Sequence, residues 1–152
     1  MNKHANHNKL RLGKMPSWQR WLSYIFFSLC LLSGLIWFVL VDFLSQLPHQ
    51  VKIWWLVHGI SSLICFILLG AALPQHVSIT WRSKRNRLGG GIATAILFFL
   101  LISSLFLFYG WESVHEPIRC LHIGLGLLLA IFFPWHIIRG RQSVTQLDFI
   151  KR

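Results

Sequence analysis

Four apolar stretches dominate this chain of 152 residues and constrain its fold more than any other feature. Each has about the 20 residues that an α-helix needs to cross the hydrocarbon core of a bilayer. We place them at residues 21–41, 53–77, 92–111 and 121–138. Because they take up more than half of the chain, no room remains for a separate soluble domain. The sequence therefore predicts an all-α fold, an integral membrane four-helix bundle with short loops over residues 21–141.

The distribution of charge supports this class and indicates an orientation. Only 12% of the residues are charged, whereas soluble domains carry about a quarter. The net charge of +11 could suggest a nucleic-acid partner, but the basic residues cluster before the first stretch, after the second and after the fourth. The other two loops hold only Lys52 and Arg119 besides acidic residues. This positive-inside pattern predicts a multi-pass protein with both termini cytoplasmic, whose basic clusters contact lipid and not nucleic acid.

Two of the four stretches carry a histidine near each end. His58 and His76 bracket the second stretch, and His122 and His136 bracket the fourth. An ionisable ring is costly in hydrocarbon, so it marks function by default. In a regular α-helix, the 18 residues from His58 to His76 give a rise of roughly 27 Å and almost no net rotation. The 14 residues from His122 to His136 give roughly 21 Å and fall about 40° short of full turns, so each pair is expected on one helix face.

The second and fourth stretches run parallel in this topology, which places His58 and His122 in the outer leaflet and His76 and His136 in the inner one. Imidazoles from two facing helices can fill both axial positions of a haem iron. The sequence therefore predicts two stacked b-type haems whose iron is bound by these four histidines. A zinc site would need its ligands within about 2.1 Å of one ion, whereas these histidines form two pairs separated by most of the bilayer. A proton relay would usually bring carboxylates into the membrane, but all four acidic residues fall outside the stretches.

Other side chains are candidates for secondary roles. The cations placed to bind haem propionates are Arg119 on the outer side and Arg82 and Arg139 on the inner side. Long basic side chains also reach the interface without any ligand. His115 could replace His122 as the outer ligand, and Pro117 fits the first turn of the fourth helix. The cysteines have no repeating spacing and no Cys-x-x-Cys-His, so we interpret them as small apolar residues.

The two halves of the chain resemble each other. Ser33-Gly34-Leu35 matches Ser103-Ser104-Leu105, and both inner histidines end a Pro-x-His triplet. These matches indicate duplication of a two-helix unit about an axis along the membrane normal. Small residues follow both outer histidines, among them Gly59 and Gly124, as a porphyrin between helices requires. The histidine spacings differ by about one helical turn, which a kink at Pro74 could partly absorb.

The chain resembles the bacterial di-haem cytochrome b membrane family, the cytochrome b561-like group, and within it the compact branch associated with flavinylated extracytoplasmic proteins. The resemblance covers residues 18–141. The segments that carry it are Leu56-Val57-His58-Gly59, Pro74-Gln75-His76, Leu121-His122-Ile123-Gly124 and Trp135-His136-Ile137. The chain departs from the family in the 18-residue spacing between His58 and His76, because shorter spacings are common in the family.

The resemblance implies a place in the bacterial cytoplasmic (inner) membrane and electron transfer between a quinone or quinol and a partner redox protein. The small soluble surface favours a subunit of a larger redox complex. Two alternatives stay open: a haem-free anchoring or assembly subunit whose histidines tie helices together, and a small quinol or superoxide oxidoreductase that acts alone.

Overall fold

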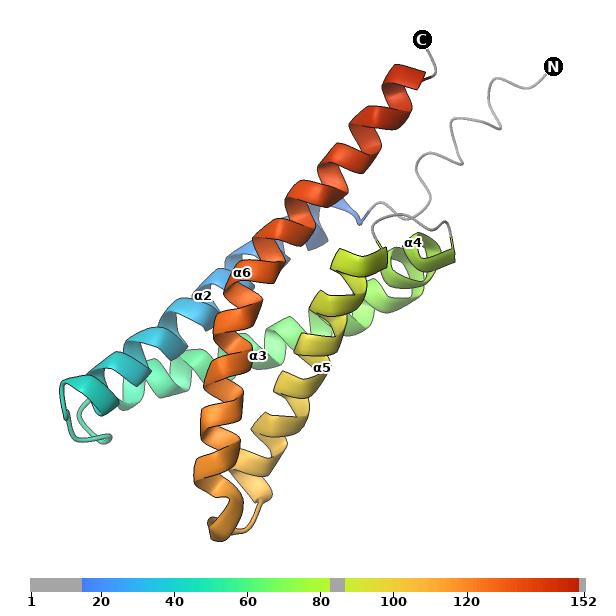
Figure 1. Ribbon diagram of the computed structural model, residues 1–152. Coiled ribbons are helices and arrows are strands. Elements are labelled where there is room, and N and C mark those ends of the chain that lie inside the picture. The colour runs from blue at the N-terminus through green and yellow to red at the C-terminus, as the bar shows by residue number, and fades with distance from the viewer. Residues whose placement is uncertain (1–14, 83–86, 151–152) are drawn as a thin grey trace. The chain divides into compact units, whose positions relative to one another are not determined.

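The computed structural model describes residues 15–82 and 87–150, and within these ranges the chain is helical with no strand (Figure 1). The basic residues that we assigned to the first 14 positions, to the loop at 83–86 and to the last two positions lie outside the described residues. The elements in chain order are α2 (Ser17–Phe38), η1 (Val39–Phe43), α3 (Lys52–Ala72), η2 (Leu73–Val77), α4 (Ser78–Arg82), α5 (Arg87–Tyr109) and α6 (Glu112–Ile150).

The all-α class and the four long helices are confirmed. Four helical segments of the described chain are long and apolar enough to cross a membrane: Ser17–Phe43, Lys52–Ala72, Arg87–Tyr109 and Glu112–Gln142. Their ends differ from the predicted ones, most of all at the last helix. It begins at Glu112, nine residues before the apolar stretch, and its backbone stays helical to Ile150 through the predicted tail. Pro117 therefore lies inside the helix, and our placement of it in the first turn is wrong.

The helices form two compact units, one up to Ile79 and one from Thr80 onward. In the first, α2 packs along α3, and we name this pair hairpin 1. In the second, α5 packs along α6, and we name this pair hairpin 2. Residues 44–51 connect the helices of hairpin 1, whereas only Gly110 and Trp111 connect those of hairpin 2.

Hairpin 1 is held together by small side chains. Ser33 of α2 and Ser61 of α3 are almost completely buried, and Cys65 is buried near them along α3. Both hydroxyls donate to a carbonyl of their own helix, Ser33 to Leu29 at 2.7 Å and Ser61 to Val57 at 2.6 Å. Small residues of this kind let two helix backbones approach closely, and the internal hydrogen bonds allow a hydroxyl to be buried without cost to its pairing.

In hairpin 2, the fully buried residues lie on one helix only. Along α5 the buried residues are Gly89, Ala93, Ile96, Leu97 and Ser103. No residue of α6 between Glu112 and Gln142 is fully buried. Each hairpin therefore covers only a narrow face of its helices. Large apolar side chains elsewhere are open, for example Ile67, which is 71% exposed, and Ile131, which is 67% exposed. Such faces require an apolar environment, since soluble proteins seldom expose contiguous apolar surface of this extent.

Two π-helical turns interrupt hairpin 1. The turn η2 contains Pro74 and His76, and η1 ends α2. A π-turn has i→i+5 hydrogen bonds, so it rotates the chain by less than 100° per residue. Our estimate of almost no rotation between His58 and His76 treated this stretch as a regular α-helix, and η2 shows that it is not one. The irregularity occurs at Pro74, where we expected a kink.

Candidate functional site

His58 is held against α2 through one of its ring nitrogens. The Nδ1 atom lies 2.8 Å from the main-chain oxygen of Cys30, and the Cys30 sulfur lies 3.6 Å from the same nitrogen. A carbonyl oxygen can only accept, so Nδ1 is the donor and carries the proton. In the neutral imidazole the lone pair then lies on Nε2. The contact therefore fixes both the ring orientation and the nitrogen that can bind a metal.

Gly34 makes this contact possible. A Cβ atom built at position 34 would lie 2.7 Å from Nδ1 and 2.8 Å from Cε1 of His58. Real Cβ contacts of that length essentially never occur, so any other residue would displace the imidazole. The glycine thus provides the gap through which the ring reaches the backbone of α2.

His122 is held in the same way by a different kind of acceptor. Its Nδ1 atom lies 2.8 Å from Oγ of Ser103 on α5. The same oxygen lies 3.0 Å from the carbonyl oxygen of Leu100, and the hydroxyl has one proton for these two contacts. With that proton on Leu100, Oγ accepts from Nδ1–H of His122; with it on the ring, Nδ1 is the acceptor. Ser103 is only 2% exposed, which limits access of water to the contact.

The two inner histidines lie in hairpin 2 and in a π-turn of the first unit. His136 lies beside Gly90 of α5, where an added Cβ would be 3.5 Å from Cε1 of the ring, an ordinary contact distance. His76 lies in the π-turn η2. Both rings are half-buried, as are His58 and His122. All four predicted ligands therefore lie within folded helix, none of them on a fully exposed face.

The pairing of ligands joins residues of different hairpins and stays a prediction. Within the described ranges 15–82 and 87–150, no three His, Cys, Asp or Glu side chains gather so that they could hold one metal ion. A haem differs from such a site because its porphyrin supplies four ligands and the protein needs to supply only two.

Glycines next to the outer histidines fit a flat cofactor. A Cβ built at Gly59, Gly124 or Gly126 would meet nothing within 4 Å. Small residues usually serve close helix packing, but packing inside each hairpin does not account for these three. They leave smooth backbone beside His58 and His122, which is the surface that a porphyrin between helices needs.

The predicted propionate partners lie at exposed or partly exposed positions. Arg119 forms a bidentate ion pair with Glu116, with Nε–Oε2 at 2.9 Å and Nη2–Oε1 at 2.8 Å. That carboxylate would compete with a propionate for the same guanidinium. The guanidinium of Arg139 lies over the ring of Trp135 at 5.7 Å, and Arg82 ends α4 in an exposed position. A role of these cations in haem binding stays a prediction.

His115 connects the two ends of the short turn in hairpin 2. Its side chain is exposed, and Nε2 donates to the carbonyl of Leu107 at 3.2 Å across the connection between α5 and α6. This contact gives the ring a structural role at the turn.

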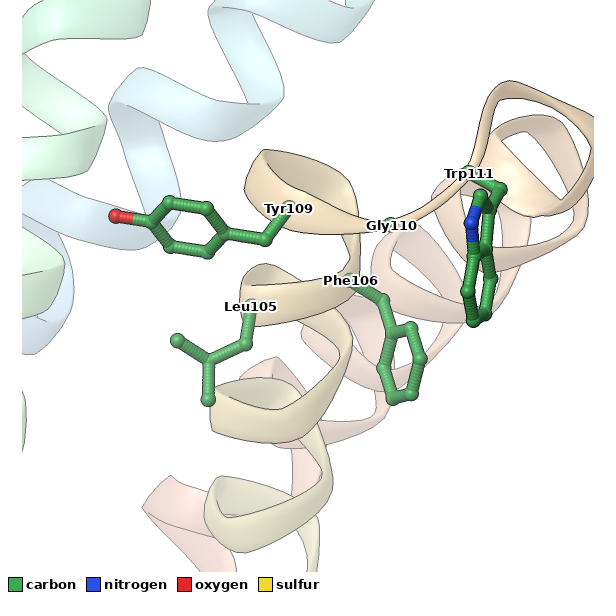
Figure 2. Close-up of a pocket in the computed structure, with 5 residues that line it drawn as sticks. All are labelled: Leu105, Phe106, Tyr109, Gly110 and Trp111. Atoms are coloured by element: carbon green, nitrogen blue, oxygen red, sulfur yellow. The ribbon is translucent and has the colours of Figure 1, made fainter.

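An apolar depression of about 350 Å³ lies at the same turn, lined by Leu105, Phe106, Tyr109, Gly110 and Trp111 (Figure 2). In Figure 2 the ring of Tyr109 points away from those of Phe106 and Trp111. The lining contains no carboxylate, imidazole, thiol or basic group, so it offers no acid–base or metal chemistry.

Sequence reasoning missed three groups that hold the outer histidines: the carbonyl of Cys30, Gly34 and Ser103. The match between Ser33-Gly34-Leu35 and Ser103-Ser104-Leu105 pointed to this region, but not to the contacts.

Comparisons with family models, with curated proteins and with solved structures found no match for this chain.

Proposed function

We propose that this chain is a membrane cytochrome with two b-type haems, which carries electrons across the bacterial cytoplasmic membrane or between quinone and a partner redox protein. The observation that carries the proposal is the matched state of the outer histidines. In each hairpin, Nδ1 of one of them lies 2.8 Å from an oxygen of the first helix, the Cys30 carbonyl for His58 and Oγ of Ser103 for His122. Metal-binding histidines typically donate their other ring N–H in this manner, because the bond fixes the tautomer and raises the basicity of the ligating nitrogen.

The four helices support the membrane part of the proposal. Their open apolar faces match a lipid environment, and the basic residues in the tails support cytoplasmic termini by the positive-inside rule. Because little of this sequence lies outside the helices, we propose that a partner redox protein in a larger complex provides the dehydrogenase site.

His58 and His122 are the proposed ligands of the outer haem, and His76 and His136 those of the inner haem. Arg119 on the outer side and Arg82 and Arg139 on the inner side are the proposed propionate partners. Bound between two imidazoles, a haem supplies one-electron transfer at a saturated iron. The chain positions the rings, excludes water with its apolar faces and offers short loops as docking surfaces.

The visible spectrum of the purified protein tests this proposal. The chain is expressed with ample haem, purified in detergent and reduced with dithionite. We expect sharp α and β bands of low-spin haem and two haems per chain by pyridine haemochrome assay. A preparation that is folded by circular dichroism but has no such bands would refute the cytochrome.

One observation favours the alternative of a haem-free anchoring subunit. The hydrogen bonds of His58 and His122 tie the two helices of each hairpin together, which is a structural role in itself. On this alternative, His58→Ala and His122→Ala lower the thermal stability of a protein that never contains haem. The same spectrum separates the two functions.

A further inference from the structure

Ser103 differs in its bonding from every comparable serine near the outer histidines. Its hydroxyl oxygen lies 2.8 Å from Nδ1 of His122, which lies on the other helix of the hairpin. Ser104, the next residue, donates to Leu101 of its own helix at 2.7 Å. Ser33, its counterpart in the repeat, donates to Leu29 and Cys30 of its own helix at 2.7 and 3.1 Å. Only Ser103 among the three connects a helix hydroxyl to a histidine.

From this contact we infer that Ser103 is a positioning residue: it fixes the Nδ1–H tautomer of His122 and thereby sets the donor strength of Nε2 toward the outer haem. The inference deepens the proposed function and rests on it for the haem. The fixation of the tautomer does not depend on haem, because the serine, its bond to Leu100 and the ring all belong to hairpin 2.

The chemistry of this role follows from the type of acceptor. An acceptor on Nδ1–H pushes electron density toward Nε2, which makes the imidazole a stronger donor and favours ferric iron. The Ser103 oxygen is buried, and the Leu100 carbonyl 3.0 Å away can take its proton, which leaves the oxygen as an acceptor toward the ring. Replacement of Ser103 removes the oxygen that lies against Nδ1. Both nitrogens can then compete for the proton and for the iron.

The first experiment measures the tautomer without haem. Protein expressed under haem depletion is labelled with ¹⁵N-histidine, and the Nδ1 and Nε2 signals of His122 are assigned by their loss in His122→Ala. We expect the wild type to be protonated at Nδ1. Ser103→Ala should show a mixture of tautomers, and the matched controls Ser104→Ala and Ser33→Ala should match the wild type. A wild-type tautomer in Ser103→Ala would overturn the inference.

The second experiment measures the loaded protein by redox titration. Ser103→Ala should raise the midpoint potential of one haem and weaken its retention about 10- to 100-fold, the usual effect of removing the partner of a metal ligand. Ser104→Ala should leave both potentials unchanged. Ser103→Thr, which keeps the hydroxyl, should restore the wild-type potential. Equal potentials in Ser103→Ala and the wild type would overturn the inference.

The outcomes separate this inference from the proposed function. A wild type that binds no haem refutes the cytochrome, while the tautomer measurement still decides the role of Ser103. A wild type with two haems and an unchanged Ser103→Ala refutes only the role of Ser103. If Ser103→Ala does not accumulate, Ser103→Cys, a weaker acceptor of similar size, is measured and judged by the same criteria.

Discussion

Hairpin 1 and hairpin 2 place Nδ1 of their outer histidines against oxygens of different kinds. His58 rests on a main-chain carbonyl, and His122 rests on a serine hydroxyl. The sequence match between the two halves aligns Gly34 with Ser104. Without a Cβ at position 34, the ring of His58 reaches the backbone of α2. The second half has a Cβ at the equivalent position, and there the neighbouring Ser103 provides the acceptor.

Nδ1 is the ring atom that meets an oxygen in both hairpins, although the two oxygens belong to different groups. On the proposed function, Nε2 of each ring would have to keep its lone pair for iron, and a hydrogen bond from Nδ1–H would secure that lone pair.

The largest expected effect comes from removing the ligands themselves. His58→Ala and His122→Ala should each reduce haem content from two per chain to one, because each variant lacks one of the two imidazoles that would hold the outer haem. Haemochrome assay and optical titration of the remaining haem measure this. His115→Ala is the control and should keep both haems. Retention of two haems in both ligand variants would show that the pairing is wrong, and loss in His115→Ala would assign that ring as a ligand.

Gly34→Ala should be the next most damaging change, and it affects hairpin 1 only. Alanine favours a helix over glycine by about 1 kcal/mol, so propensity alone predicts a more stable protein. Because its methyl group would lie 2.7 Å from Nδ1 of His58, we expect instead at least a tenfold loss of outer haem.

Two matched variants sharpen this result. Gly70→Ala lies on α3 with nothing within 4 Å of the added carbon, so haem content should stay unchanged. Ser104→Ala, at the counterpart of Gly34, should also be silent. Equal haem content in Gly34→Ala and Gly70→Ala would refute the claim that His58 needs this gap.

Gly110→Ala should destabilise hairpin 2 by about 1–3 kcal/mol, the range for a strained backbone position. A Cβ there would collide with the carbonyl oxygen of Phe106, to which the Gly110 N–H already donates. The two-residue connection leaves no slack to relieve this collision. Thermal unfolding in detergent measures the loss, with Gly70→Ala as the control because nothing lies within 4 Å of its added carbon. Equal midpoints for the two variants would contradict the geometry of this turn.

The helices were predictable because their length and apolarity are properties of single segments. The start of α6 was not, because residues 112–120 are polar and give no apolar signal, although they continue the helix. His58 and His122 stood out by the cost of an ionisable ring in hydrocarbon. Their partners depend on the register between neighbouring helices, which is set by the unequal connections at 44–51 and 110–111. Spacing along one helix carries no information about that register, so Cys30 and Ser103 could not be found from it.

The smallest expected effect is a gain in stability, and it comes from a substitution in the connection of hairpin 1. Ser45 has φ of 50°, the left-handed region where residues with a Cβ are disfavoured by about 1–2 kcal/mol. It follows a widened helix end in which Leu44 N–H donates to Val39 and Gln46 N–H to Leu40. Glycine is the usual residue after such an end. Since glycine also loses more entropy on folding, Ser45→Gly should stabilise hairpin 1 by only about 0.5–1 kcal/mol.

A rise in the thermal midpoint of Ser45→Gly, against the fall expected for Gly110→Ala, would show that the two connections differ in strain as their backbones indicate. A fall in both would mean that Ser45 contributes through its hydroxyl, and that the contrast between the two turns does not lie in the backbone.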